Sequence, residues 1–117
     1  MKQNFSAEQS KSKAELSTSP YPAIGNTVEV NFGKMSFVLN FKNNKQMSFK
    51  GQSGATDSVE YTATEIAKNI FMVYWHEPNV GDNVVHIQDF NQGIVYTNIA
   101  SKNGEFLHLK GTIKIIN

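Results

Sequence analysis

The stretch that decides the fold is Ile70-Phe71-Met72-Val73-Tyr74-Trp75-His76-Glu77-Pro78, residues 70–78. Its first six residues are apolar without interruption, polar residues precede them, and a proline follows shortly after. A short apolar run between two breakers predicts a strand that is buried on both faces. The run is too short for an ordinary buried helix, so we expect further strands in the sequence around it.

On both sides of this stretch, apolar and polar side chains alternate with the period of a β-strand. Asparagine- and glycine-containing turn signals separate the alternating segments, as expected for hairpins. The predicted strands lie at Val28–Phe32, Met35–Phe41, Met47–Phe49, Val59–Ala63, Ile70–Trp75, Val84–Phe90, Ile94–Ala100 and Phe106–Ile116. About eight strands at roughly ten-residue spacing, with no room for a helix between them, predict an all-β, antiparallel, up-and-down barrel. A barrel of this size is either filled by its own side chains or holds one small ligand.

The composition is that of a globular protein with a single core. The chain has 117 residues, of which 39% are hydrophobic and 11% aromatic. Its 11 basic and 10 acidic residues give a formal net charge of +1, so we expect neither nucleic acid nor membrane as a partner. The chain has no cysteine, which excludes disulfides, thiolate catalysis and cysteine-ligated zinc.

The amino-terminal residues differ from the rest of the chain. Residues 1–22 are polar and predict a flexible tail or a short helix over 7–16, ahead of a single barrel domain at 23–117. Residues 1–19 have no apolar core of a signal peptide, and no apolar run approaches the ~20 residues that span a bilayer. We therefore expect a cytoplasmic protein, or a periplasmic or secreted one if a signal peptide has been removed.

Glu77 is the first candidate for chemistry. On a strand it shares one face with Phe71, Val73 and Trp75. If that face points inward, Glu77 lies at the mouth of the barrel, where partial desolvation would raise its pKa and suit it to proton transfer. The alternative interpretation is a solvated residue at the end of a strand.

The three histidines, His76, His86 and His108, lack the local spacing of a metal site. We expect them to be unrelated surface or core residues, and we expect neither a metal nor a cofactor. Gly51–Gly54 does not predict a phosphate loop, because no helix follows it.

Several segments of the chain resemble small calycin-type (lipocalin-like) barrels, in particular the MoaF-like family and the bacterial phenolic acid decarboxylases. The resemblance covers most of residues 25–100. It rests on Gly25, Phe37-Val38-Leu39, Met47–Gly54 and Phe71–Pro78, and for the MoaF-like family also on Asp89-Phe90 and Gly93-Ile94-Val95. The Trp-x-Glu-Pro turn and the aromatic-basic-x-x-Ser-Gly segment are its most specific parts.

The decarboxylase resemblance implies Glu77 as a barrel-lining acid or base, and it aligns Lys50 with an arginine that holds the substrate carboxylate. The two tyrosines of that family have no counterpart in Val28–Phe32, and lysine lacks the bidentate fork of arginine. The MoaF-like resemblance implies ligand binding more than a reaction.

Three hypotheses for the function follow. The first is a module that binds an apolar or aromatic small molecule; its expected ligand contacts are Phe32, Phe37, Phe49, Lys50, Phe71, Trp75, Glu77 and Leu109. The second is a lyase or decarboxylase for an aromatic acid, with Glu77 and Lys50 as its catalytic residues. The third is a filled barrel that binds a protein partner through an edge or its tail. A homodimer is compatible with each of them.

Overall fold

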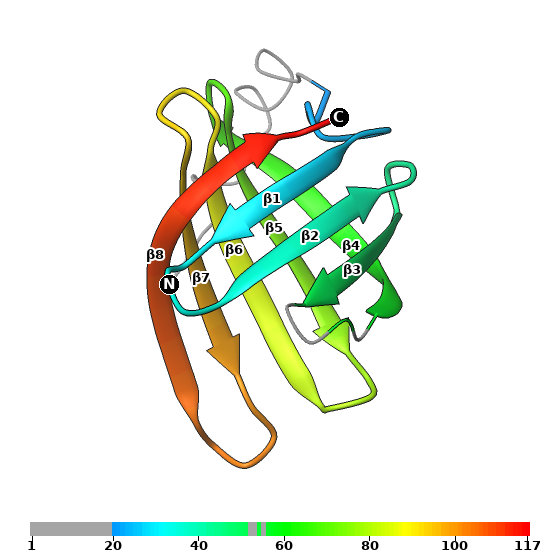
Figure 1. Cartoon of the computed structure of the whole chain (residues 1–117), viewed down its shortest axis with the longest axis vertical. Helices are drawn as coiled ribbons and strands as arrows, with labels where there is room; N and C mark the ends of the chain where they lie inside the picture. Colours follow the sequence, from blue (N-terminus) through cyan, green and yellow to red (C-terminus); the bar gives the residue numbers. More distant parts are fainter. Residues whose placement is uncertain (1–19, 52–53, 55) are drawn as a thin grey trace, which may run out of the picture.

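Eight strands close into one antiparallel barrel in the computed structural model, which describes residues 20–51, 54 and 56–117 (Figure 1). The strands are β1 (Thr27–Asn31), β2 (Ser36–Phe41), β3 (Gln46–Gly51), β4 (Thr56–Ala67), β5 (Ile70–Glu77), β6 (Asp82–Asp89), β7 (Ile94–Ala100) and β8 (Phe106–Ile115). Each strand pairs with its neighbours in sequence, and β8 pairs with β1. The predicted all-β up-and-down barrel is confirmed. In the part of the chain that the structure describes, no helix is long and apolar enough to cross a membrane.

Burial follows the alternation of the strands. In β5, Phe71 and Val73 are 2% and 0% exposed, whereas Tyr74 between Val73 and Trp75 is 40% exposed. The prediction that residues 70–75 are buried on both faces is therefore wrong. A barrel has a single wall, so only the inward face of each strand meets a core, and the apolar outward residues of β5 lie at the surface.

Tyr21 seals one end of the barrel. Its ring contacts Phe41, Phe71 and Phe90 at centroid distances of 5.1, 5.2 and 6.0 Å, and its hydroxyl donates a hydrogen bond to Gln88 Oε1. The segment that carries Tyr21 lies at the top of Figure 1, next to the carboxyl terminus. Sequence reasoning assigned Tyr21 to the polar tail, but the residue is only 6% exposed and belongs to the core. The helix suggested for residues 7–16 lies outside the described residues.

Gly111 allows β8 to close the barrel against the end of β1. A Cβ atom at this position would lie 2.1 Å from the backbone oxygen of Asn31 and 2.7 Å from the ring of Phe32. These distances are far shorter than a van der Waals contact, so only glycine fits here without displacing backbone.

Candidate functional site

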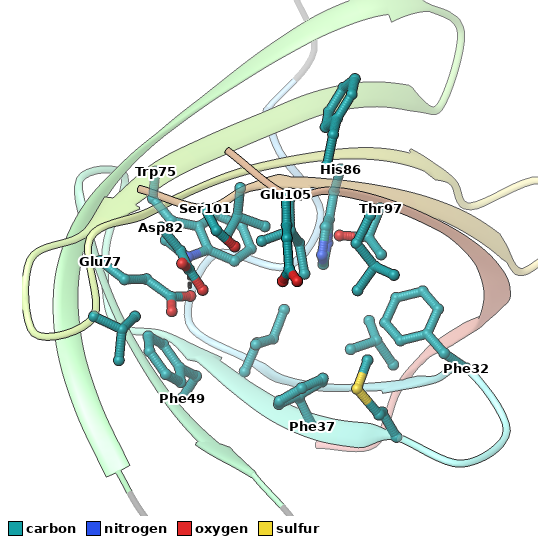
Figure 2. A pocket seen from close by; sticks show the side chains of 18 residues that line it. Phe32, Phe37, Phe49, Trp75, Glu77, Asp82, His86, Thr97, Ser101 and Glu105 are labelled. Atoms are coloured by element: carbon teal, nitrogen blue, oxygen red, sulfur yellow. Dashed lines mark hydrogen bonds between the residues drawn. The ribbon is translucent and has the colours of Figure 1, made fainter. Parts of the chain in front are cut away.

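A cavity of about 690 Å³ occupies the barrel interior at the end opposite Tyr21 (Figure 2). Its walls are mainly aromatic and aliphatic, with Phe32, Phe37, Leu39, Phe49 and Trp75 among the lining side chains. The turn residue Val80 and the residues around the β7–β8 turn lie at its rim. This volume falls within the usual range of small-molecule sites, about 300–1,000 Å³.

Five of the predicted contact residues line this cavity. They are Phe32, Phe37, Phe49, Trp75 and Glu77. Each reaches the interior because side chains point alternately inward and outward along a strand. Phe32 follows the end of its strand and continues the same alternation. Figure 2 shows the rings of Phe37 and Phe49 on the wall facing Trp75.

The other three predicted residues are not among those that line the cavity. Lys50 is exposed, because its neighbour Phe49 points inward and consecutive side chains of a strand face opposite sides. Phe71 packs instead on Tyr21 near the closed end. Leu109 is the direct partner of Thr97 across the sheet and is partly buried, but it does not reach the cavity surface.

Glu77 lies at the mouth and is tied to Trp75, whose Nε1–H donates a hydrogen bond of 2.8 Å to Glu77 Oε2. Partial burial raises the pKa of the Glu77 carboxyl, and the bond from Trp75 lowers it by a smaller amount. The nearby carboxylates of Asp82 and Asp57 add to the increase. Asp82 is also the register partner of Glu77 at the start of β6.

Three acidic side chains, Glu77, Asp82 and Glu105, line the cavity, and Figure 2 labels all three. No lysine is among the lining residues of the described chain, and the full sequence has no arginine. A ligand anion would therefore meet carboxylates without a compensating positive charge.

His86 is a buried polar residue on the cavity wall. It is 4% exposed, and its ring contacts the ring of Trp75 edge-on at a centroid distance of 4.9 Å. Burial lowers the pKa of His86 to about 3, so the imidazole is neutral at physiological pH.

Gln88 fixes the protonation of this imidazole. The side-chain oxygen of Gln88 accepts the bond from Tyr21, so its amide nitrogen faces His86 Nδ1 at 3.1 Å. An amide nitrogen can only donate, which makes Nδ1 the acceptor and leaves the proton on Nε2.

Thr97 is the register partner of His86 on the neighbouring strand β7, and it also lines the cavity. It is 2% exposed, and its Oγ1 has no hydrogen-bond partner among the described residues. Sequence reasoning missed both Thr97 and the inward position of His86. The period-two burial that places Val84 inside also places His86 and Gln88 inside, so the signal was present in β6.

The other two histidines are surface residues. His76 Nδ1 lies 2.8 Å from Asn83 Oδ1, and His108 Nδ1 lies 2.9 Å from Asn98 Oδ1. Within residues 20–51, 54 and 56–117, no group of three histidine or acidic side chains is arranged to hold a metal ion.

Comparisons with known proteins agree with this architecture. A family model described as MoaF-like matches residues 24–114. Among solved structures, the chain is similar to a protein from Burkholderia vietnamiensis that has been provisionally called a beta-lactamase. The two share 27% sequence identity and superpose with a TM-score of 0.77, over 85% of this chain and 100% of the other. No curated protein matches the chain.

Proposed function

Because the chain belongs to the MoaF-like family of β-barrel proteins, we propose that its barrel is a binding site for a small, uncharged, largely apolar molecule that contains a ring. The observation that carries this proposal is the cavity itself. It is open at one end, sealed by Tyr21 at the other, and walled by aromatic rings with a few polar groups between them. Such a combination is typical of small-molecule sites, and it favours an open barrel over a filled one.

The charge of the cavity disfavours an anionic ligand. The three carboxylates at the lining repel an anion, and the described residues that line the site include no lysine or arginine to offset them. Deeper in the cavity the neutral imidazole of His86 offers no charge to a ligand of either sign. Burial of an unpaired charge against these walls would be costly.

A lyase for an aromatic acid is supported less well. Glu77 has the position and the raised pKa of a proton donor. However, Lys50, which the resemblance to decarboxylases would make the carboxylate anchor, lies on the outside of β3. A substrate carboxylate would then meet no positive side chain among the described lining residues, and we expect no loss of hydroxycinnamate absorbance when the protein is added.

Hydrolysis of β-lactams, which the name of the Burkholderia relative suggests, is also less well supported. The cavity contains the hydroxyl of Ser101, but none of the described residues that line it is a lysine that could activate this hydroxyl. A serine nucleophile needs an adjacent base, and among the described residues no hydrogen bond joins the Ser101 hydroxyl to an acidic or histidine side chain.

The proposal can be tested with the uncharged dye N-phenyl-1-naphthylamine, which becomes fluorescent in apolar surroundings. Trp75 is the only tryptophan of the chain and lines the cavity, so energy transfer from its indole to the dye reports binding to the barrel, and the variants below locate the dye. We expect saturable binding to the wild-type protein with transfer from Trp75.

A matched pair of variants locates the dye. Phe37→Ala removes a ring from the cavity wall, whereas Tyr74→Ala removes a ring that is exposed on the outside of β5. We expect Phe37→Ala to weaken binding by roughly tenfold, because the lost apolar contact corresponds to about 1–2 kcal/mol of binding free energy. Tyr74→Ala should leave the affinity unchanged. Absence of saturable binding, or equal effects of the two variants, would overturn the proposal.

A further inference from the structure

A chain of hydrogen bonds leads from the closed end of the barrel to His86 on the cavity wall. Tyr21, at the closed end, donates to Gln88, and Gln88 in turn donates to Nδ1 of His86. This chain of hydrogen bonds is buried, so it fixes the orientation and the tautomer of the imidazole before any ligand arrives. Nε2–H is then the ring group left to act as a donor toward a molecule in the cavity.

A second donor lies beside the first. Thr97 and His86 are direct partners in the antiparallel register of β7 and β6, and both side chains line the cavity. Direct partners have Cβ atoms about 4.5–5.5 Å apart, so the two side chains can share a ligand atom once rotation about χ1 turns Thr97 Oγ1, which has almost no accessible surface in the ligand-free protein, toward the cavity. Figure 2 shows the imidazole of His86 and the hydroxyl of Thr97 next to each other on one wall.

The hydroxyl of Thr97 is the unusual feature of this pair. The residue is 2% exposed, yet Oγ1 has no hydrogen-bond partner among the described residues. A buried hydroxyl without a partner costs roughly 1–3 kcal/mol. A valine would fill nearly the same volume without that cost, so the hydroxyl is best explained by a partner that the ligand supplies.

The chemistry of the two groups defines the partner. Nε2–H can only donate, so the ligand atom must accept, and a hydroxyl can donate to the same atom. A carbonyl oxygen carries two lone pairs in one plane and can accept both hydrogen bonds. We propose that the barrel recognises an uncharged carbonyl compound, whose oxygen is bound jointly by His86 Nε2–H and the hydroxyl of Thr97, while its ring packs against the aromatic wall.

This inference rests on the proposed function and adds the ligand class to it. The test uses 1-tetralone and tetralin, which share a two-ring frame and differ in one carbonyl oxygen. Each competes with N-phenyl-1-naphthylamine for the wild-type protein, and the ratio of the two dissociation constants measures the contribution of the oxygen. The same ratio is then measured for Thr97→Val and His86→Phe.

Thr62→Val is the control, because Thr62 is exposed on the outside of β4. We expect the preference for tetralone over tetralin to fall by roughly three- to tenfold in Thr97→Val, the equivalent of one lost hydrogen bond, and to stay unchanged in Thr62→Val. His86→Phe should lower the preference similarly. If His86→Phe does not fold, Thr97→Val decides alone.

The outcomes separate the two proposals. If both compounds bind but the ratio stays within twofold of the wild type in Thr97→Val, the carbonyl inference is wrong and the cavity remains a binding site. An equal loss in Thr62→Val also overturns the inference. If neither the dye nor either competitor binds to the wild type, the proposed function fails and the inference fails with it.

Discussion

His86 and Thr97 face each other across β6 and β7 as direct register partners, and both side chains are buried against the cavity. The His86 ring accepts a hydrogen bond from Gln88, whereas the hydroxyl of Thr97 has no partner among the described residues. This pair connects the hydrogen-bond chain from Tyr21 to the interior surface that a ligand would contact.

Thr97→Val should stabilise the ligand-free protein. The substitution keeps the shape of the side chain and removes a buried hydroxyl that has no partner, so we expect the free energy of unfolding to rise by about 1 kcal/mol. Urea unfolding followed by tryptophan fluorescence measures this change. A loss of stability in Thr97→Val would mean that the hydroxyl has a partner within the protein.

His86 should make the stability depend on pH. Its pKa is lowered to about 3 in the folded protein and lies near 6.5 in the unfolded chain, so the unfolded state binds the extra proton between these values. Stability contributed by the neutral imidazole is complete above about pH 6.5 and is lost as the pH falls toward 3. Between pH 6 and pH 4 the free energy of unfolding of the wild type should therefore fall more steeply than that of His86→Gln, by up to about 1.4 kcal/mol per pH unit.

Parallel urea titrations of the two proteins at several pH values measure the difference. Glu77 and the other carboxylates titrate in both proteins and cancel in the comparison. Identical pH profiles would show that His86 is solvated and free to take up a proton.

Tyr21→Phe should destabilise the barrel through its hydroxyl alone. The ring contacts with Phe41 and Phe71 are kept, but Gln88 Oε1 loses its donor inside the core, at a cost of about 1–3 kcal/mol. Tyr61→Phe is the matched control: its hydroxyl donates to the backbone oxygen of Asn43 at a partly buried site, so we expect a smaller loss. Equal losses in thermal unfolding would contradict the special role of the Tyr21–Gln88 bond.

Gly111→Ala should prevent the normal closure of the barrel. Its methyl group would lie 2.1 Å from the backbone oxygen of Asn31, which forces β1 and β8 apart, and we expect a loss of several kcal/mol. Gly51→Ala is the control, because a Cβ there meets only the ring of Phe37 at an ordinary 3.5 Å. Circular dichroism melts of both variants measure the effect. Similar melting temperatures would show that β1 and β8 can separate at little cost.

The sequence predicted the barrel and part of its interior because strand alternation is a local property. The alternation groups Phe71, Val73 and Trp75 on one face of β5, and this face is the buried one in the structure. The same parity excludes Lys50 once Phe49 is inside, so an expectation that both reach the ligand was inconsistent with a regular strand. The family resemblance aligns Lys50 with a ligand-binding arginine but carries no information about which way the strand faces.

The residues that the sequence did not predict to lie inside the barrel owe their positions to contacts between segments that are distant in the sequence. Tyr21 follows a polar segment, and nothing local shows that it packs on Phe41 and Phe71. His86 and Thr97 are neighbours because of the register in which β6 pairs with β7. This register depends on the conformation of the turn between the two strands, which the sequence defines only approximately.

The central claim, that the cavity binds an uncharged small molecule, is tested most directly by comparing two dyes of the same frame. N-phenyl-1-naphthylamine is neutral, and 8-anilinonaphthalene-1-sulfonate carries one additional sulfonate. The measurement is the dissociation constant of each dye, read by energy transfer from Trp75. We predict saturable binding of the neutral dye and binding at least tenfold weaker for the sulfonate, because the cavity lining, as far as the structure describes it, has three carboxylates and no lysine or arginine. Tighter binding of the sulfonate, or no binding of the neutral dye, would contradict the account.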